Sequence, residues 1–268
     1  MVHDAFRNRL RAESIRHEVT SPGQLWRNVE VVAETGSTNS DLVARAAAGE
    51  DVGGLVLIAE HQTAGRGRLG RNWAAAPLAQ LTLSAGIDVA DVPTSLWGWL
   101  PLIAGLAVVE AVEATAAVET ALKWPNDVLA GKGKLAGILS EVAANQTIIV
   151  GIGLNVTLRA DEVGEPQVTS LMDLGVVDPD RTGLAVEVLR RLGERVDAWR
   201  SGDPRLMDEY RSRCDTIGQR VRATLPGDRA VEGIAVDVDD LGRLRIDTGD
   251  EAVTVSAGDI THLRPVNP

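Results

Sequence analysis

The sequence GRGRLGRNW at residues 65–73 places three arginines and three glycines within seven positions of a chain whose net charge is −11. Glycines allow the backbone to approach a ligand closely, because they adopt conformations that other residues avoid. Arg66 and Arg68, two positions apart in an extended segment, are expected to project from the same side. Guanidinium groups donate paired hydrogen bonds that suit carboxylates and phosphates. The stretch therefore predicts a loop that binds an anion.

The residues on either side place this loop between two strands. An apolar run at residues 55–60 predicts a buried strand, and the alternating pattern at residues 80–87 predicts the next one. The glycines formally match the dinucleotide fingerprint GxGxxG, but that fingerprint requires a helix directly after them, and Pro77 and a strand follow instead. No Walker loop occurs either. Phosphates are therefore expected to bind to side chains and an irregular loop.

Lysine is confined to one short region of the chain. Lys123 opens the sequence KWPND at residues 123–127, and Lys132 and Lys134 lie in KGKLAGIL at residues 132–139, whereas arginine is used throughout. The compact ammonium of lysine, on its flexible side chain, can follow a phosphate or carboxylate through a reaction more readily than the rigid, planar guanidinium of arginine can. The alternative interpretation is an arginine-biased genome with three accidental surface lysines.

The bulk composition is that of an ordinary globular protein, with 44% hydrophobic and 24% charged residues. The 268 residues allow one large domain, or a medium domain with a small one appended. The negative charge and a pI near 4.9 argue against general binding to nucleic acids or anionic membranes. The first residues lack the apolar run of a secretion signal, so a cytoplasmic location is expected.

Residues 92–109 carry no charge and approach the length of a membrane-spanning helix. Acidic residues flank this segment on both sides, whereas membrane helices are oriented by neighbouring lysines and arginines. The sequence Pro-Thr-Ser at residues 93–95 resembles a helix start. We therefore predict a buried core helix.

The residues of other common catalytic sites are missing from the sequence. Cys214 is the only cysteine, which excludes an intramolecular disulfide, and we expect it to be structural. The four histidines lack metal-ligand spacing, so no structural metal is predicted, and no GxSxG nucleophile motif occurs. Chemistry based on arginine, lysine and glycine indicates stabilisation of anions and of a leaving phosphate.

The remaining pattern predicts an α+β protein in which helices flank a mixed β-sheet. Thr38 and Asp41 resemble a capping box at the start of an alanine-rich helix. Short strands after residue 217 predict a small antiparallel barrel, with a domain boundary near residue 216. Helices are expected at residues 1 to about 27, 38–49, 93–112, 182–200 and 204–214. The other strands are expected at residues 29–34, before 123, and at 128–130, 135–142 and 148–156.

Several sequence blocks together resemble the biotin protein ligase family. They occur in the family's order and span residues 37 to 156, and five blocks in order, together with the single residue Gln62, make the match specific although each alone is weak. They are Ser37-Thr38-Asn39, Gln62, GRGRLGRNW at 65–73, KWPND at 123–127, KLAGIL at 134–139 and GIGLN at 151–155.

This resemblance implies a class II synthetase-like catalytic domain at residues 1–216 and an SH3-like domain at residues 217–268. It implies that biotin and ATP with Mg²⁺ form biotinyl-5′-adenylate, and that the biotinyl group then passes to a lysine of a biotin carboxyl carrier domain. Longer family members carry a winged helix that binds DNA. Only 36 residues precede Ser37, so no nucleic-acid partner is expected, and the protein is expected to be a monomer or a weak homodimer.

The resemblance also implies roles for individual residues. Lys134 and Arg68 are the implied catalytic residues, and Asp127 is the implied metal ligand. The implied biotin contacts are Ser37, Thr38, Asn39, Gln62, Gly65, Arg66, Gly67, Arg68, Lys134 and Gly137, and the implied ATP and adenylate contacts are Arg66, Arg68, Arg71, Trp73, Asn126, Lys134 and Asn155.

Two other functions remain open at the level of sequence. A lipoate or octanoate ligase or transferase would use the same broad fold. A non-catalytic protein that only binds biotin would retain the pocket without the chemistry, although Lys134 argues against it.

Overall fold

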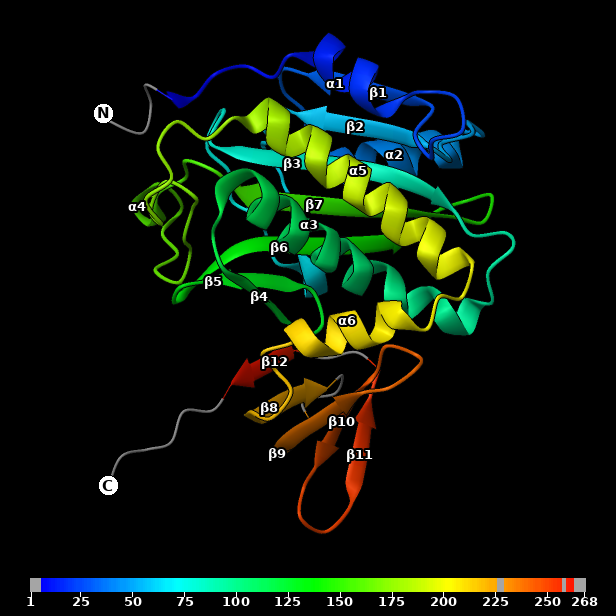
Figure 1. Ribbon diagram of the computed structural model, residues 1–268, viewed down its shortest axis with the longest axis vertical. Coiled ribbons are helices and arrows are strands. Elements are labelled where there is room, and N and C mark those ends of the chain that lie inside the picture. Colours follow the sequence, from blue (N-terminus) through cyan, green and yellow to red (C-terminus); the bar gives the residue numbers. More distant parts are fainter. Residues whose placement is uncertain (1–5, 226–228, 257–258, 263–268) are drawn as a thin grey trace.

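The computed structural model describes residues 6–225, 229–256 and 259–262, and it contains two β-sheets and the helices that cover them (Figure 1). The helices are α1 (Ala12–Val19), α2 (Thr38–Ala47), α3 (Leu100–Ala116), α4 (Ala160–Val163), α5 (Arg181–Arg200) and α6 (Arg205–Arg213), with 3₁₀ segments η2 (Arg68–Gly70) and η3 (Thr94–Trp99). The first sheet comprises β1 (Asn28–Val32), β2 (Leu55–Ala59), β3 (Gln80–Asp88), β4 (Thr120–Lys123), β5 (Asp127–Ala130), β6 (Gly133–Val142) and β7 (Thr147–Asn155). The second comprises β8 (Arg220–Leu225), β9 (Arg229–Val238), β10 (Leu244–Asp247), β11 (Ala252–Val255) and β12 (Asp259–His262).

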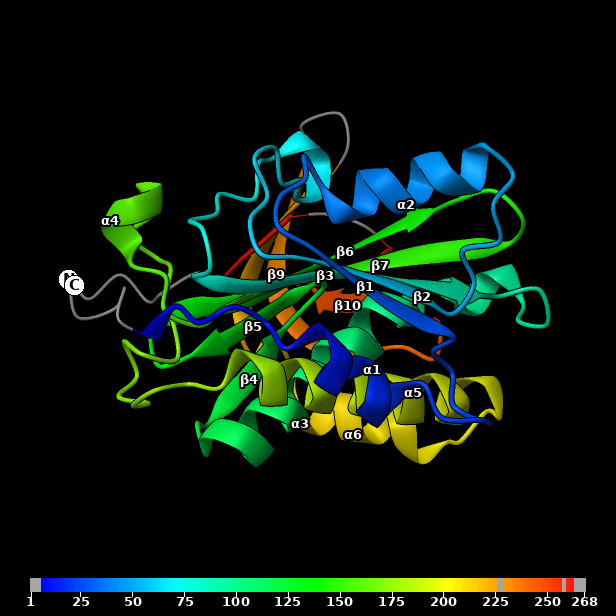
Figure 2. The same cartoon turned by 90° about the horizontal axis from the view of Figure 1, so that it is seen from above.

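The seven-stranded sheet is mixed, with strand order β1-β2-β3-β7-β6-β5-β4. Only β1 and β2 run parallel to each other, and the remaining neighbours are antiparallel. Viewed from above, α1, α3 and α5 lie on one face of this sheet and α2 lies on the other (Figure 2). The predicted α+β class, with a mixed sheet and a small antiparallel sheet after it, is confirmed.

Strand β3 shows why the two faces of the sheet differ. Leu81, Leu83 and the following odd-numbered residues are buried in the core that α3 and α5 cover. Thr82 and Ser84 alternate with them and point to the opposite face, since successive side chains of a strand alternate. The alternation therefore leaves a polar row on the α2 side of the sheet.

From Trp99 onward, the apolar segment 92–109 belongs to this core, as predicted, whereas residues 93–95 and 98 are exposed. By length and composition, Thr94–Ala116 is apolar enough to cross a membrane. However, 67% of its most apolar 18-residue stretch is buried inside the protein. The ring of Trp99 contacts Tyr210 of α6 edge to face, with centroids 5.7 Å apart. Cys214 is buried beside Tyr210, and burial raises the pKa of its thiol, in keeping with a structural role.

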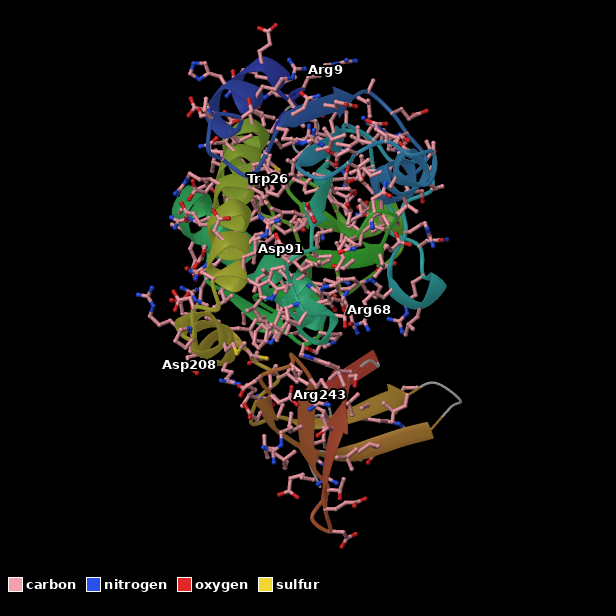
Figure 3. All side chains as sticks on the ribbon, turned by 90° about the vertical axis from the view of Figure 1, so that its right-hand side faces the viewer. Arg9, Trp26, Arg68, Asp91, Asp208 and Arg243 are labelled. Carbon is pink, nitrogen blue, oxygen red and sulfur yellow. The ribbon has the colours of Figure 1, made fainter. Side chains whose placement is uncertain are left out.

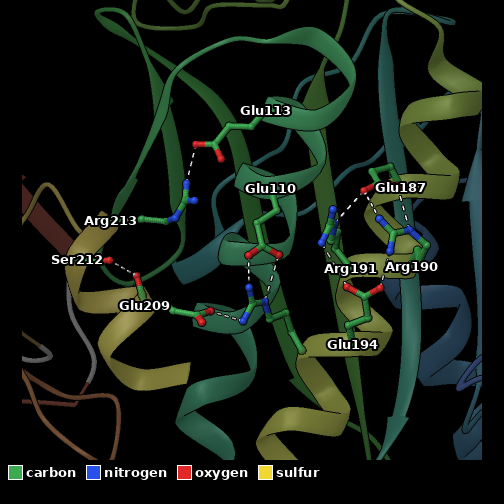
Figure 4. Close-up of polar contacts among 10 residues, drawn as sticks. Glu110, Glu113, Glu187, Arg190, Arg191, Glu194, Glu209, Ser212 and Arg213 are labelled. Carbon is green, nitrogen blue, oxygen red and sulfur yellow. Dashed lines mark hydrogen bonds and ion pairs between the residues drawn. The ribbon is translucent and has the colours of Figure 1, made fainter. Parts of the chain in front are cut away.

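Ion pairs join α3, α5 and α6 on the outer side of the helical layer (Figure 4). Arg195 of α5 pairs with Glu110 of α3 and with Glu209 of α6. Arg213 at the end of α6 pairs with Glu113 of α3 at 2.5 Å. These contacts hold the three helices to one another, and they are remote from the polar face of the sheet.

The five-stranded sheet, with order β11-β10-β9-β8-β12, lies below α6 in Figure 1. Two tryptophans of the first unit donate indole hydrogen bonds to its β9–β10 turn, Trp99 to the Asp240 carbonyl at 2.9 Å and Trp124 to the Gly242 carbonyl at 3.0 Å. The boundary predicted near residue 216 falls between α6 and β8. It stays a prediction, because Thr216 is itself tied back to Trp124 by a hydrogen bond of 3.0 Å.

Several element predictions were wrong in detail. The amino-terminal helix covers only Ala12–Val19, because the chain before it is held by tertiary contacts instead. Ser37, not Thr38, caps α2, and the Asp41 carboxylate accepts from Thr35 Oγ1 rather than closing a capping box. The core helix begins in η3 and becomes α-helical only at Leu100.

Candidate active site

A cavity of about 1270 Å³ lies on the polar side of the seven-stranded sheet, between α2 and the loop at residues 65–73. Every residue that the family resemblance implied, except Gly65, lines it. The lining includes Ser37, Thr38, Asn39, Gln62, Arg66, Gly67, Arg68, Arg71, Trp73, Asn126, Asp127, Lys134, Gly137 and Asn155, together with Ser84 and all three lysines. Residues from five separate blocks of sequence therefore meet at one place.

One end of the cavity is a buried, uncharged network of hydrogen bonds. Gln62 Oε1 accepts from the Thr38 backbone N–H at 2.8 Å and from Thr38 Oγ1 at 2.9 Å. Ser84 Oγ donates to Asn39 Oδ1 at 2.6 Å and lies 2.7 Å from Thr38 Oγ1. Because the carbonyl oxygen of Gln62 is engaged, its amide N–H groups remain as donors. This end suits a neutral polar ligand.

Glycines make room for two side chains at the floor of the cavity. A Cβ added at Gly151 would lie 2.2 Å from Asn39 Oδ1, and one at Gly153 would lie 2.5 Å from the Trp73 ring. Gly153 pairs with Gly137 across β6 and β7, and the Trp73 ring lies over both. The missing side chains therefore allow Asn39 and Trp73 to lie directly on the sheet.

Lys134 lies at the start of β6 with its ammonium in the cavity. Its Nζ is 2.7 Å from Asp127 Oδ1 and 5.5 Å from the centroid of the Trp73 ring. Its backbone N–H donates to the Gln167 carbonyl at 2.7 Å, and its carbonyl accepts from the Thr169 N–H at 3.1 Å. Main-chain bonds to a second segment therefore fix the base of this lysine.

Asn155 is fully buried behind Lys134. Its Nδ2 donates to the carbonyls of Lys134 at 3.2 Å and Thr169 at 3.0 Å, and its Oδ1 accepts from Gln80 Nε2 at 2.9 Å. Both amide N–H groups are thus engaged by the main chain. In this arrangement Asn155 holds Lys134 in place, and its implied contact with the adenine edge stays a prediction.

The arginine loop is held mainly by side chains and by its own base. Gly65 and Trp73 close the base through a backbone bond of 2.8 Å, and Arg66 forms a bridge with Asn72. Arg66 and Arg68 reach different partners: Arg66 lies 3.2 Å from Glu141, and Arg68 Nη1 donates to Asn126 Oδ1 at 3.1 Å.

Gly67 between these arginines is extended, as predicted, but the chain turns from Arg68 onward. Residues 68–70 form the turn η2, in which Leu69 has a φ of 57°. Leu69 is also exposed at the tip of the loop. Figure 3 shows Arg68 on the lower edge of the first unit, above Arg243 of the second sheet.

The implied metal role of Asp127 stays a prediction. Its carboxylate pairs with Lys134, and the described residues contain no group of three or more His, Cys, Asp or Glu side chains that would hold a metal ion. Mg²⁺ commonly binds through one or two carboxylates and the phosphates of its substrate, so a single carboxylate fits that mode.

Sequence reasoning missed Ser84, Gln80 and Glu141. The alternating pattern of β3 carried a signal for Ser84 and Gln80, since both lie on its polar face. No local signal marked Glu141, because its partners Arg66 and Asn39 are remote in the chain.

Comparison with known proteins gives consistent matches. Residues 35–155 match the biotin/lipoate A/B protein ligase family, and residues 216–263 match the biotin protein ligase C-terminal domain. The biotin–acetyl-CoA-carboxylase ligase of Mycobacterium tuberculosis is 56% identical over 97% of this chain and 98% of its own length.

Two solved structures share the fold over 89% of this chain. The biotin protein ligase from Aquifex aeolicus in complex with biotin and ATP superposes with a TM-score of 0.77 at 29% identity, covering 100% of that chain. The biotin protein ligase from Leishmania major in complex with biotinyl-5-AMP gives a TM-score of 0.59 at 26% identity and 99% coverage.

Proposed function

We propose that this chain, which belongs to the biotin/lipoate A/B protein ligase family, is an ATP-dependent biotin protein ligase. In the first step the carboxylate of biotin attacks the α-phosphate of ATP, which forms biotinyl-5′-adenylate and releases pyrophosphate. In the second step a lysine amine of a carrier protein attacks the biotinyl carbonyl, which forms an amide and releases AMP. The observation that carries the proposal is one cavity with a neutral polar end and a cationic end.

The neutral end fits the ureido ring of biotin. That ring carries both donors and an acceptor but no charge, so it needs oriented hydrogen bonds rather than ions. Thr38, Asn39, Gln62 and Ser84 present amide and hydroxyl groups that are already oriented by one another. The buried network therefore supports recognition of a neutral cyclic urea.

The cationic end brings two anions together. Biotin's carboxylate and the triphosphate repel each other, and Lys134, Arg66 and Arg68 supply positive charge where they meet. Preorganised charges of this kind contribute several kcal/mol to such reactions, on the order of 3 kcal/mol for one removed donor. Backbone bonds fix the main chain of Lys134 and the ion pair with Asp127 orients its ammonium, so the charge is positioned before the substrates arrive.

The remaining implied contacts extend from this centre. Trp73 offers an aromatic face beside Lys134, which suits adenine, and Arg71 and Asn126 lie along the same wall. Asp127 would hold Mg²⁺ together with the phosphates, and the ion would neutralise the leaving pyrophosphate. The arginine loop would exclude water from the mixed anhydride until the acceptor amine enters.

The acceptor, the cell compartment and the assembly follow from the same proposal. The named relative from M. tuberculosis acts on an acetyl-CoA carboxylase, so we propose the biotin carboxyl carrier domain of a carboxylase as the acceptor. We also propose a cytoplasmic location, a monomer or weak homodimer, and a division into a catalytic domain at residues 1–216 and a small domain at 217–268.

The test is ATP–pyrophosphate exchange by the purified protein with Mg²⁺ and biotin, run in parallel with octanoate and lipoate. We expect exchange with biotin alone, followed by ATP-dependent labelling of a purified carrier domain. Exchange with octanoate or lipoate but not with biotin would instead favour a lipoate-type ligase. Biotin binding without exchange would leave a non-catalytic biotin-binding protein.

A further inference from the structure

Glu141, near the end of β6, connects the neutral end of the cavity to the arginine loop. Its Oε1 lies 3.2 Å from Arg66 Nη1, and its Oε2 accepts from Asn39 Nδ2 at 2.9 Å. We propose that Glu141 is a positioning residue that couples occupation of the biotin pocket to closure of the arginine loop. This inference rests on the proposed function, because it assigns biotin to the pocket that contains Asn39.

The position of Glu141 on the sheet makes this bridge possible. Gly137, Leu139 and Glu141 follow one another on the cavity side of β6, since every second residue faces the same way. Leu139 pairs with Gly151 across the sheet, and the absence of a side chain at Gly151 lets Asn39 lie against the strands. Asn39 therefore reaches the carboxylate of Glu141, which is the next residue after Leu139 on the same face of β6.

The two contacts of Glu141 differ in how firmly they are held. Asn39 is buried, with its Oδ1 accepting from Ser84 and its Nδ2 also donating to the Leu139 carbonyl at 3.2 Å. Arg66 is 54% exposed, and beyond Glu141 its described contact is a weak bond of 3.4 Å to Ser40 Oγ. Glu141 is thus anchored on the pocket side, and on the loop side it makes the shorter of the two described side-chain contacts of Arg66.

The coupling follows from this shared carboxylate. A ligand that hydrogen-bonds to Asn39 or Ser84 further restricts the Asn39 amide, whose Nδ2 faces the Glu141 carboxylate. A well-oriented Asn39 fixes the carboxylate and strengthens its pairing with the guanidinium. Glu141 therefore connects the pocket to the loop through side chains, in addition to the backbone bond from the Ala64 N–H to the Gly36 carbonyl at the start of the loop.

The experiment uses limited digestion with trypsin, because the loop offers the enzyme three arginines, at 66, 68 and 71. Cleavage within the loop is followed for the full-length wild type and for Glu141→Gln, with and without biotin. Glutamine retains an acceptor for Asn39 but removes the charge that holds Arg66. Glu50→Gln is the matched control, since Glu50 also pairs with an arginine on the surface, Arg45, but lies at the far end of α2.

We expect Glu141→Gln to speed loop cleavage roughly two- to fivefold without biotin, the upper part of the range for a partly exposed ion pair. Biotin should protect the loop in the wild type and in Glu50→Gln, and it should protect the loop poorly in Glu141→Gln. The double variant Arg66→Gln with Glu141→Gln should be cleaved no faster at Arg68 and Arg71 than the single variants, because all three lose the same contact.

Equal protection by biotin of the wild type and Glu141→Gln would overturn the proposal, and so would additive effects in the double variant. Biotin binding is measured separately by calorimetry. If the wild type does not bind biotin, the proposed function fails, whereas the cleavage rates without biotin still decide whether Glu141 restrains the loop. Thermal unfolding of each variant confirms that the folded state is retained.

Discussion

Two walls of one cavity are built in opposite ways. Lys134 lies on β6, and backbone hydrogen bonds to residues 167 and 169 and a bond from the buried Asn155 fix its main chain. The arginine loop opposite is closed at its base and otherwise depends on side-chain contacts such as Arg66 with Glu141 and Arg68 with Asn126. Lys134, which must meet the reacting atoms, stands on a fixed main chain. The arginines of the loop are held by side-chain contacts that can break, so that the loop can open and admit substrates.

The largest expected effect is on the stability of the sheet that carries the rigid wall, because Arg181 also donates to the Gln80 carbonyl of β3. Arg181 at the start of α5 pairs with Glu60 after β2 at 2.8 Å, and its exposure is only 3%. Burial lowers the pKa of the Arg181 guanidinium, although the charge of Glu60 opposes this shift. Replacing Arg181→Met leaves Glu60 buried without its counter-ion, which should cost roughly 3–5 kcal/mol of unfolding free energy.

Urea denaturation followed by circular dichroism measures that loss. Arg68→Gly in the loop is the companion variant, and its unfolding free energy should fall by no more than about 1.5 kcal/mol, because it removes one charge-assisted hydrogen bond but leaves no buried charge unpaired. Equal destabilisation by the two substitutions would remove the distinction between a rigid wall and a loosely held one.

The next effect concerns catalysis on the rigid wall. Lys134→Ala should lower kcat/KM for biotinyl transfer by at least about 30-fold, or about 2 kcal/mol, because it removes a preorganised charge from the reacting centre. Lys134→Arg should also be impaired, since a planar fork cannot replace a compact ammonium between Asp127 and Trp73.

Lys132→Ala provides the comparison for these variants. Lys132 lies in the turn before β6, so its replacement should lower kcat/KM less than that of Lys134. Steady-state rates with a purified carrier domain give the kcat/KM of each variant relative to the wild type. Near-normal turnover by Lys134→Ala would contradict its placement at the reacting centre.

A smaller effect is expected when the loop loses its contact with Asn126. Arg68→Gly should speed escape of biotinyl-5′-adenylate roughly tenfold, the equivalent of about 1.4 kcal/mol, because a charge-assisted hydrogen bond is removed. Release is measured by trapping labelled adenylate after dilution. Unchanged retention of the intermediate would mean that the loop is not its shield.

The smallest effect on function is expected where the Trp73 ring of the arginine loop contacts the sheet at Gly153. A Cβ at residue 153 would lie 2.5 Å from the Trp73 ring, so Gly153→Ala should displace the ring. Because Trp73 belongs to the adjustable loop, we expect the KM for ATP to rise only about threefold, or about 0.7 kcal/mol. The KM for biotin serves as the internal control, and a larger rise for biotin than for ATP would place Trp73 at the other end of the cavity.

Local sequence pattern was sufficient for most of the strands. The alternation in β3 predicted both its burial and its polar face, and the apolar run at 55–60 corresponds to β2. The pattern failed at the amino terminus, where Arg7 pairs with Glu162, Leu10 N–H donates to Glu60, and Arg181 donates to the Asn8 carbonyl. These long-range bonds replace the first part of the helix that was expected at residues 1 to about 27.

The candidate site shows the same limit. The chemistry of the arginine loop and the lysines could be read from residue type, because charge and donor geometry belong to each side chain. Their partners could not, since strand register decides that Gly137 meets Gly153 and that Glu141 lies within reach of Asn39.

Residue types and local periodicity were thus enough to establish the mixed sheet, the buried core helix and a loop suited to anions. The tertiary structure alone decided which wall is rigid, that Asn155 supports Lys134, and that Glu141 joins the loop to the pocket. The physical reason is the separation of the interacting residues along the chain. Periodicity reflects only the few residues around each position, whereas the hydrogen bond between Asn39 and Glu141 exists only once the whole sheet has formed.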